Sequence, residues 1–276
     1  LRADGKPKMS MITMLVGAGL NVILDPIFIY AFRMGMSGAA IATIISQFVS
    51  MVWSIHHFLK RDALHRIQLR YMRLDRDLAL EITSLGMPGF LIQLFSSILN
   101  LILNNALVIY GGDIAVSGMG IVTSIATLLV LPVIGLNQGL QPIVSFNYGT
   151  KNYERVNKAA RLAIIIATCM TSFGFILIRT IPVLMVSMFN QDKDLVEFTV
   201  HALQTWLMIL PFLGFQIIGS NFFQAIGRPK RAMFLTLLRQ VLILIPSILI
   251  LSRLFGLNGI LYAAPIADLA ATIVTG

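Results

Sequence analysis

Long, nearly uncharged apolar runs constrain the fold of this sequence more than any other feature. A run of about 18 or more apolar residues indicates a helix that spans a membrane. Only 12% of the 276 residues are charged, which is about half the share in soluble domains. The sequence therefore predicts an all-α, polytopic membrane protein, with spanning helices over 9–32, 36–58, 82–110, 114–147, 157–189, 194–226, 231–254 and 258–276. Prolines inside these runs predict bends at Pro132, Pro182, Pro211 and Pro246.

The basic residues lie mainly in the loops on one side of these predicted helices. Those loops hold sixteen of the 21 Lys and Arg residues, so the positive-inside rule places them in the cytoplasm. The net charge of +9 is therefore a membrane-topology signal and does not indicate a nucleic-acid partner. We expect a multi-pass protein of the plasma membrane (the inner membrane of a bacterium or archaeon), in contact with the lipid bilayer. The single cysteine, Cys169, excludes a disulfide framework, and we expect its thiol to be buried.

Two segments near the ends of the chain resemble each other. Residues 3–8 (ADGKPK) match residues 225–230 (AIGRPK), and Met11 and Leu15 match Met233 and Leu237, at an offset of 222. Residues 35–38 (GMSG) match 256–259 (GLNG), and Ala42 matches Ala263, at an offset of 221. Each copy is a basic turn, a helix, a glycine turn and a second helix. Both copies start on the cytoplasmic side, so the repeat is parallel.

The spacing of the two copies predicts the domain organisation. Four further helices precede the second copy, so we expect two six-helix bundles related by the parallel repeat, the first of them incomplete here. Residues 1–58 would be the last two helices of the amino-terminal lobe, 59–80 a cytoplasmic linker between the lobes, and 81–276 the carboxy-terminal six-helix lobe. The expected structural partner is helices one to four of the same protein.

A carboxylate beside a proline lies inside the first apolar run. A charge at bilayer depth costs at least ~2.5–3.5 kcal/mol and usually faces a cavity or a partner. Asn21 and Asp25 share a helix face, and Pro26 frees the carbonyl of Val22 and predicts a kink. Thr43 lies at a similar depth on the next helix, because the turn falls midway between it and Asp25. These groups could bind a hard cation such as Na⁺, or relay a proton; the alternative is a buried Asp that only caps a kink.

Other polar residues lie within the later spans. Arg239 and Asp268 are candidates for a charge pair, with either a structural role or a role in proton movement or gating. Interior amides are candidates for lining a substrate cavity, or alternatively for joining helices: Gln93, Asn100, Asn104 and Gln216. The sequence has no phosphate-binding loop, no metal-spaced His/Cys set and no nucleophile elbow, so we expect neither an enzyme nor a cofactor.

Three stretches resemble the multidrug and toxic compound extrusion family. They are residues 139–149 (GLQPIVSFNYG), like that family's helix-eight motif; residues 224–229 (QAIGRP), like the turn before its helix eleven; and Asn21-x-x-x-Asp25-Pro26 in the position of its helix five. The resemblance covers the whole chain as helices five to twelve. It implies a twelve-helix exporter, driven by Na⁺ or H⁺, that expels bulky and often cationic drugs.

The resemblance also implies a branch of the family and a coupling site. One branch uses an Asp on helix one, Asn and Asp on helix five, and Thr on helix six, and Asn21, Asp25 and Thr43 match the last three. Another branch uses a Glu in helix seven and an Asp in helix ten. Here Glu81 lies only at the cytoplasmic edge of helix seven, and helix ten has no interior acid. The sequence is therefore similar to the amino-lobe-cation-site (DinF-like) branch.

The resulting hypothesis is a secondary active multidrug efflux antiporter that works by alternating access. It would export amphipathic or cationic small molecules in exchange for Na⁺ or H⁺. An alternative is a flippase for lipid-linked saccharides, which would need a wide cavity rich in Arg and Lys, and only Arg239 is a clear interior base. A membrane-embedded enzyme or receptor would need clustered catalytic groups or large soluble loops, and the sequence shows neither.

Overall fold

The computed structural model of the chain describes residues 7–59 and 75–275. Its residues divide into two compact units, Leu1–Arg76 and Asp77–Gly276. All regular secondary structure within the described residues is helical, which confirms the predicted all-α class. The residues of the repeat that lie at 3–6, and most of the predicted linker, lie outside the described residues.

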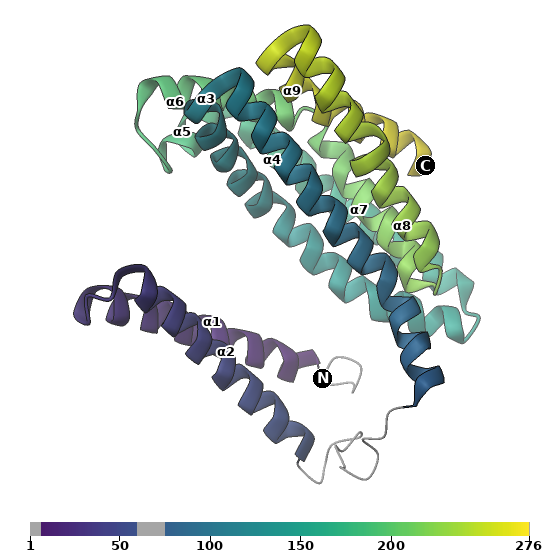
Figure 1. Ribbon diagram of the computed structural model, residues 1–276. Coiled ribbons are helices and arrows are strands. Elements are labelled where there is room, and N and C mark those ends of the chain that lie inside the picture. The colour runs from purple at the N-terminus through teal and green to yellow at the C-terminus, as the bar shows by residue number, and fades with distance from the viewer. Residues whose placement is uncertain (1–6, 60–74, 276) are drawn as a thin grey trace. The chain divides into compact units, whose positions relative to one another are not determined.

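The first unit is a helical hairpin. It consists of α1 (Pro7–Pro26), the π-helical segment η1 (Ile27–Ala31) and α2 (Gly35–Leu59), shown in purple in Figure 1. The two helices meet along a seam of small residues, where Thr13, Ala42 and Ser46 are buried. Small side chains let helix backbones approach closely in a membrane, where packing replaces the hydrophobic effect as the driving force.

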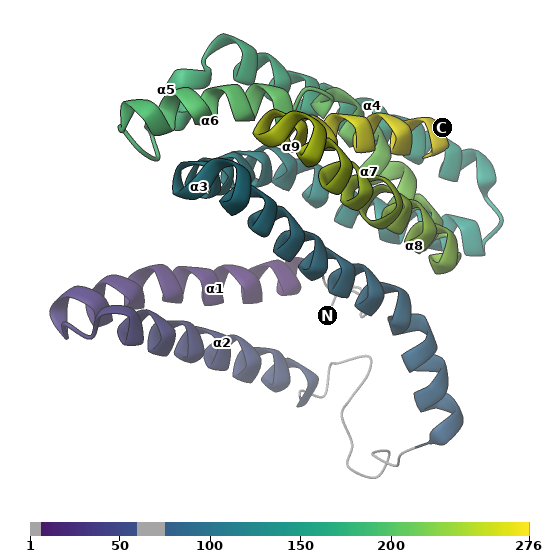
Figure 2. The ribbon, with the colours of Figure 1, turned by 45° about the horizontal axis from the view of Figure 1, so that its top comes forward.

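The second unit contains eight helical segments within the described residues. The longest helix, α3 (Arg76–Gly149), is divided by Gly112, whose φ of 62° is not helical. The helices that follow are α4 (Tyr153–Thr180), α5 (Pro182–Ser187), α6 (Lys193–Trp206), α7 (Leu210–Ala225), α8 (Pro229–Leu237), the π-helical η3 (Leu238–Leu244) and α9 (Ile245–Thr275). Helix α9 is divided by Gly256, with φ 59°. Figure 2 shows α3, α4, α7 and α9 lying side by side in this unit, which gives it the form of a bundle.

Two apolar clusters hold the second unit together. The larger one joins α3, α6, η3 and α9 through fully buried side chains such as Leu107, Leu203 and Ile260. The smaller one joins the second half of α3 to α4 and α7 through Val144, Ala167 and Ile218. Many large apolar side chains outside these clusters are exposed, as expected for helices whose outer faces contact lipid.

The helices agree with the predicted number of spans. Five described helices are long and apolar enough to cross a membrane, and α6 and α7 form a sixth candidate as a bent pair. Since Gly112 and Gly256 divide α3 and α9, the described residues contain eight apolar segments. Two of the predicted proline bends are present: the run 157–189 breaks at Ile181 before Pro182, and the run 194–226 bends by 52° between α6 and α7, just before Pro211. One boundary differs from the prediction, since α3 already begins at Arg76.

The two glycine turns of the repeat each have a glycine with a positive φ. Gly35 and Gly256 occupy matching positions and have φ values of 55° and 59°, a region that favours glycine. Three residues later, a Cβ on Gly38 would lie 2.9 Å from the backbone of Phe28, and a Cβ on Gly259 would overlap the carbonyl of Leu251. Ala42 and Ala263, also matched, are both fully buried. Each hairpin therefore has a positive-φ glycine at its turn, a glycine at a close approach three residues later and a buried alanine one turn further on.

Candidate cation-coupling site

The structure brings Asn21, Asp25 and Thr43 together in the first hairpin. The amide nitrogen of Asn21 lies 3.4 Å from Asp25 Oδ1 on the same helix. It also lies 3.3 Å from Thr43 Oγ1 on the opposite helix, α2. One amide group therefore links the carboxylate to the hydroxyl across the hairpin.

The direction of these hydrogen bonds follows from the partners of Thr43. Its hydroxyl donates to the carbonyl of Ala39 at 2.9 Å, so it accepts from Asn21 rather than donating to it. Asn21 then donates to both Thr43 and Asp25, and its own Oδ1 is not used in this network. Four oxygen-bearing groups, including the peptide carbonyl freed by Pro26, are thus within one or two turns of each other. Such a set suits a hard cation or a proton.

Only one carboxylate is present in this cluster. The described residues contain no group of three His, Cys, Asp or Glu side chains that could hold a metal ion. A single negative charge with neutral oxygen ligands fits a monovalent cation better than a divalent one, since divalent sites in proteins usually use more carboxylates. The cluster could therefore hold Na⁺ or accept a proton.

The local backbone around Asp25 is irregular. Pro26 ends α1 and is followed at once by the π-helical turn η1, in which Phe32 N–H donates to the Ile27 carbonyl at 3.0 Å. Proline removes one helical hydrogen bond, and single π-helical turns often mark functional sites in α-helices. The predicted kink at Pro26 thus coincides with a change of helix type directly after the carboxylate.

A pocket of about 540 Å³ opens beside this cluster within the first unit. Asn21 and Thr43 belong to its wall, and the other lining residues are Met14, Gly17, Ala18, Ser46, Gln47 and Ser50. Sequence reasoning did not anticipate this pocket. Gly17 lies on the same helix face as Asn21, one turn earlier, but it allows a close approach of α2, since a Cβ there would lie 2.2 Å from Ser50 Oγ.

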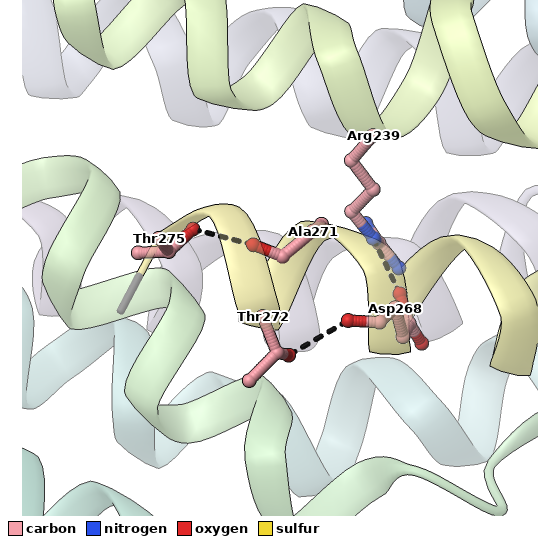
Figure 3. Close-up of polar contacts among 5 residues, drawn as sticks. All are labelled: Arg239, Asp268, Ala271, Thr272 and Thr275. Atoms are coloured by element: carbon pink, nitrogen blue, oxygen red, sulfur yellow. Dashed lines mark hydrogen bonds and ion pairs between the residues drawn. The ribbon is translucent and has the colours of Figure 1, made fainter.

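The second hairpin of the repeat, formed by α8, η3 and α9, holds an ion pair whose acid is buried. Arg239 lies on η3, and its Nε donates to Asp268 Oδ1 on α9. Figure 3 shows the arginine reaching across from its own helix to the carboxylate. The side chain of Asp268 is 5% exposed and that of Arg239 28% exposed. The neighbouring Gln240 Oε1 lies 3.1 Å from Ser96 Oγ on α3, so η3 has polar contacts with two helices.

The offsets of the repeat relate this ion pair to the pocket of the first hairpin. Arg239 matches Gly17 at 222, and Asp268 matches Gln47 at 221. Both Gly17 and Gln47 line the pocket. The first hairpin therefore has two uncharged pocket-lining residues at the positions where the second hairpin has two paired charges.

The amides predicted to line a substrate cavity fall into two groups. Gln93, Asn100 and Asn104 are exposed on the first half of α3, at spacings of seven and four residues that place them on one face. Gln216 lies on α7 and is buried, 6% exposed. The structure thus gives α3 a polar stripe and places Gln216 inside the packing of the second unit.

The fold and the apolar helices define a class, the polytopic all-α membrane proteins. A family model described as MatE matches residues 88–269. This match covers well over half of the chain, and the chain belongs to that family, the multidrug and toxic compound extrusion family, as the motifs in its sequence predicted.

Individual relatives agree with this assignment. The chain is 32% identical over 267 residues to the multidrug export protein MepA of Staphylococcus aureus strain MSSA476, a match that covers 97% of the chain and 58% of the relative. It is similar to an outward-facing multidrug resistance transporter of the MATE family, with a TM-score of 0.86 and 29% identity over 96% of the chain and 60% of that structure. An inward-facing structure matches with a TM-score of 0.80 and 28% identity, over 100% of the chain and 64% of that structure. The chain thus spans about three fifths of the length of these relatives.

Proposed function

We propose that the protein carrying this chain is a secondary multidrug efflux antiporter. It exports bulky amphipathic or cationic compounds across a bacterial or archaeal inner membrane in exchange for Na⁺ or H⁺. The observation that carries the proposal is the cluster of Asn21, Asp25 and Thr43 beside a pocket, in a chain of the MatE family. A carboxylate is kept at membrane depth, at a cost, where an ion could reach it.

Ion binding would rearrange the hydrogen bonds of this cluster. In the structure, the Asn21 amide donates to both Asp25 and Thr43. A Na⁺ at Asp25 would repel the amide N–H groups and favour rotation of Asn21, which then presents Oδ1 to the cation and releases Thr43. A proton on Asp25 would weaken the same hydrogen bond, since a neutral carboxyl is a poorer acceptor. Cation binding would thus release Thr43 and open the link between α1 and α2, whereas protonation would weaken the contact of Asn21 with Asp25 within α1.

The change can be transmitted along the first helix. Pro26 and η1 follow Asp25 directly, and a π-helical turn can shift its hydrogen bonds by one residue at small cost. For antiport, the ion and the drug must each prefer a different bend of this helix, because a ligand shifts an equilibrium only through its differential affinity for the two states. Asn21, Asp25 and Thr43 are the coupling residues of this proposal, and it follows the amino-lobe-cation-site branch of the family.

Two observations bear on the alternatives. A flippase for lipid-linked saccharides would need Arg239 to bind a pyrophosphate, but its guanidinium is paired with Asp268. The enzyme and receptor alternatives do not agree with membership of the MatE family. The antiporter therefore remains the proposal that the residues support best.

Efflux by the full-length protein in proteoliposomes tests this proposal. Ethidium efflux would be measured with an imposed Na⁺ gradient at equal pH, and separately with a pH gradient in the absence of Na⁺. We expect Asp25→Asn to reduce gradient-driven efflux at least tenfold. The matched control is Asp113→Asn, which neutralises an exposed acid just after the break in α3 and should leave efflux unchanged. Wild-type efflux by Asp25→Asn under both gradients would remove the proposal.

A further inference from the structure

We propose that a basic pocket at the start of α8 binds the headgroup of an anionic glycerophospholipid from the leaflet predicted to be cytoplasmic. The pocket has a volume of about 360 Å³ and lies at the meeting point of α7, α8 and α9. Lys230 and Arg231 supply its charge, and Phe223, Phe234 and Val274 supply apolar surface. This site is separate from the coupling cluster, so the inference goes beyond the proposed function.

The charges of this pocket favour a phosphodiester. Lys230 and Arg231 are both exposed, and the lining contains no carboxylate among the described residues. They lie in the first turn of α8, where the helix dipole also favours an anion and no side chain caps the helix. Arg offers a planar fork that matches two phosphate oxygens, and Lys adds a mobile point charge.

The apolar wall distinguishes a lipid from a free anion. Phe234 lies three and four residues after Arg231 and Lys230, hence on the same face of α8 and about one turn, or ~6 Å, further along the helix. Phe234 is 54% exposed and Val274 is 50% exposed. A ligand that contacts both the basic and the apolar surfaces must carry a charged end and a hydrocarbon end. A phospholipid has this arrangement, with its headgroup at the membrane surface and its acyl chains deeper in the membrane.

The shape of the pocket depends on a close contact between two helices. A Cβ on Gly219 of α7 would lie 2.7 Å from the Thr275 methyl group, so the last turn of α9 lies directly against α7. This contact places Val274 and Thr275 as the wall opposite α8. A pocket between helices on the cytoplasmic side, lined by basic residues, is a known form of lipid-headgroup site in membrane proteins.

The chain contains an internal control for charge alone. A second pocket of about 360 Å³ carries Lys158 and Arg161, but all of its lining residues lie on the single helix α4. It has the same two types of basic residue and no aromatic wall. The first copy of the repeat provides a further comparison, because Lys8 there is followed by Met9 where the second copy has Arg231.

Lipid binding to the purified full-length protein tests the inference. Native mass spectrometry would count bound dioleoyl phosphatidylglycerol, with dioleoyl phosphatidylcholine as the zwitterionic comparison. We expect preferential binding of phosphatidylglycerol, and a loss of about 10- to 30-fold in that affinity in Lys230→Gln/Arg231→Gln, since each basic group near an anionic headgroup contributes about fivefold. The control variant, Lys158→Gln/Arg161→Gln, should change it less than threefold.

Two further arms separate a lipid from a free phosphate. Glycerol 3-phosphate carries the anion without the acyl chains, and it should not displace the lipid at equal concentration. Phe234→Ala keeps both charges and should weaken phosphatidylglycerol binding severalfold; it also decides the question if the double variant does not fold. Any of three results would overturn the proposal. Phosphatidylglycerol affinity could fall equally in the two double variants, it could be unchanged in Lys230→Gln/Arg231→Gln, or glycerol 3-phosphate could displace the lipid. None of these readouts needs transport, so a failure here leaves the antiporter proposal intact.

Discussion

The two hairpins of the repeat share a scaffold and differ in where they place polar groups. In the first, Asn21 and Thr43 are linked by a hydrogen bond, and the level one turn earlier is an open pocket. In the second, that earlier level carries the ion pair of Arg239 and Asp268. The positions that match Asn21 and Thr43 are apolar there, occupied by Ile243 and Ala264.

This difference shows that the hairpin fold requires neither polar arrangement. Both hairpins keep the positive-φ glycine turn and the fully buried alanine. In the second hairpin, the buried acid Asp268 is paired with the side chain of Arg239. In the first hairpin no basic side chain among the described residues lines the pocket, and Asn21, the hydrogen-bond partner of the acid, is part of its wall. On this comparison, only the first hairpin should respond to the coupling ion.

The largest expected effect comes from breaking the ion pair of the second hairpin. Arg239→Gln leaves Asp268 buried without its cation and should destabilise the protein by about 3–5 kcal/mol. Arg239→Met/Asp268→Leu removes both charges and should cost far less, since apolar replacement of a whole buried pair is often neutral. Equilibrium unfolding of the full-length protein in mixed detergent micelles measures both. If both variants lost the same free energy of unfolding, the ion pair would stabilise the protein by more than the neutralisation of a buried charge.

The glycines that allow close helix approach should give the next largest effect. A Cβ at Gly259 would overlap the Leu251 carbonyl, whereas a Cβ at Gly38 would approach Phe28 at 2.9 Å. Overpacking of this kind costs about 1–3 kcal/mol, so Gly259→Ala should destabilise the protein more than Gly38→Ala. The same unfolding assay ranks the two variants. The reverse order would mean that the two turns are less alike than their φ values indicate.

Transplanting the ion pair into the first hairpin tests whether the pocket matters for coupling. Gly17→Arg/Gln47→Asp/Ser50→Ala copies Arg239, Asp268 and Ala271 into their matched positions, and Ser50→Ala removes a hydroxyl that would overlap a Cβ on residue 17. We expect the triple variant to insert normally and to lose about tenfold in Na⁺- or pH-driven ethidium efflux, about 1.4 kcal/mol.

The control for the transplant is Ser50→Ala alone, which should transport normally. Wild-type efflux by the triple variant would show that space beside Asn21 is not needed for ion entry. If the triple variant did not insert, less of the protein would be found in the membrane fraction. Gln47→Asp alone would then test the effect of the added charge without filling the pocket.

Periodicity and spacing predicted much of this fold and missed its irregular parts. The eight spans and the glycine turns follow from apolar runs and from Gly35 and Gly256. Counting residues on both sides of the turn placed Thr43 level with Asp25, whereas its hydrogen bond to α1 comes from Asn21, one turn earlier. The π-helical segments could not be predicted, because no local pattern distinguishes η1 and η3 from ordinary helix. The expectation of a buried Cys169 was wrong, since this residue is exposed; an apolar run does not show which of its faces meets lipid.

The smallest effect should come from the polar contact that joins η3 to α3. The Ser96 hydroxyl lies 3.1 Å from Gln240 Oε1 and 2.9 Å from the Ile92 carbonyl, and its single hydrogen can be donated to only one of them at a time. Ser96→Ala should therefore cost about 0.5–1.5 kcal/mol, the usual value for one hydrogen bond. Ser97→Ala is the matched control, because Ser97 donates only to its own helix, at the Gln93 carbonyl. Ser96→Ala could instead lower the free energy of unfolding as much as Arg239→Gln does. In that case α3 would stabilise η3 as much as α9 does, and the second hairpin would form a three-helix unit with α3.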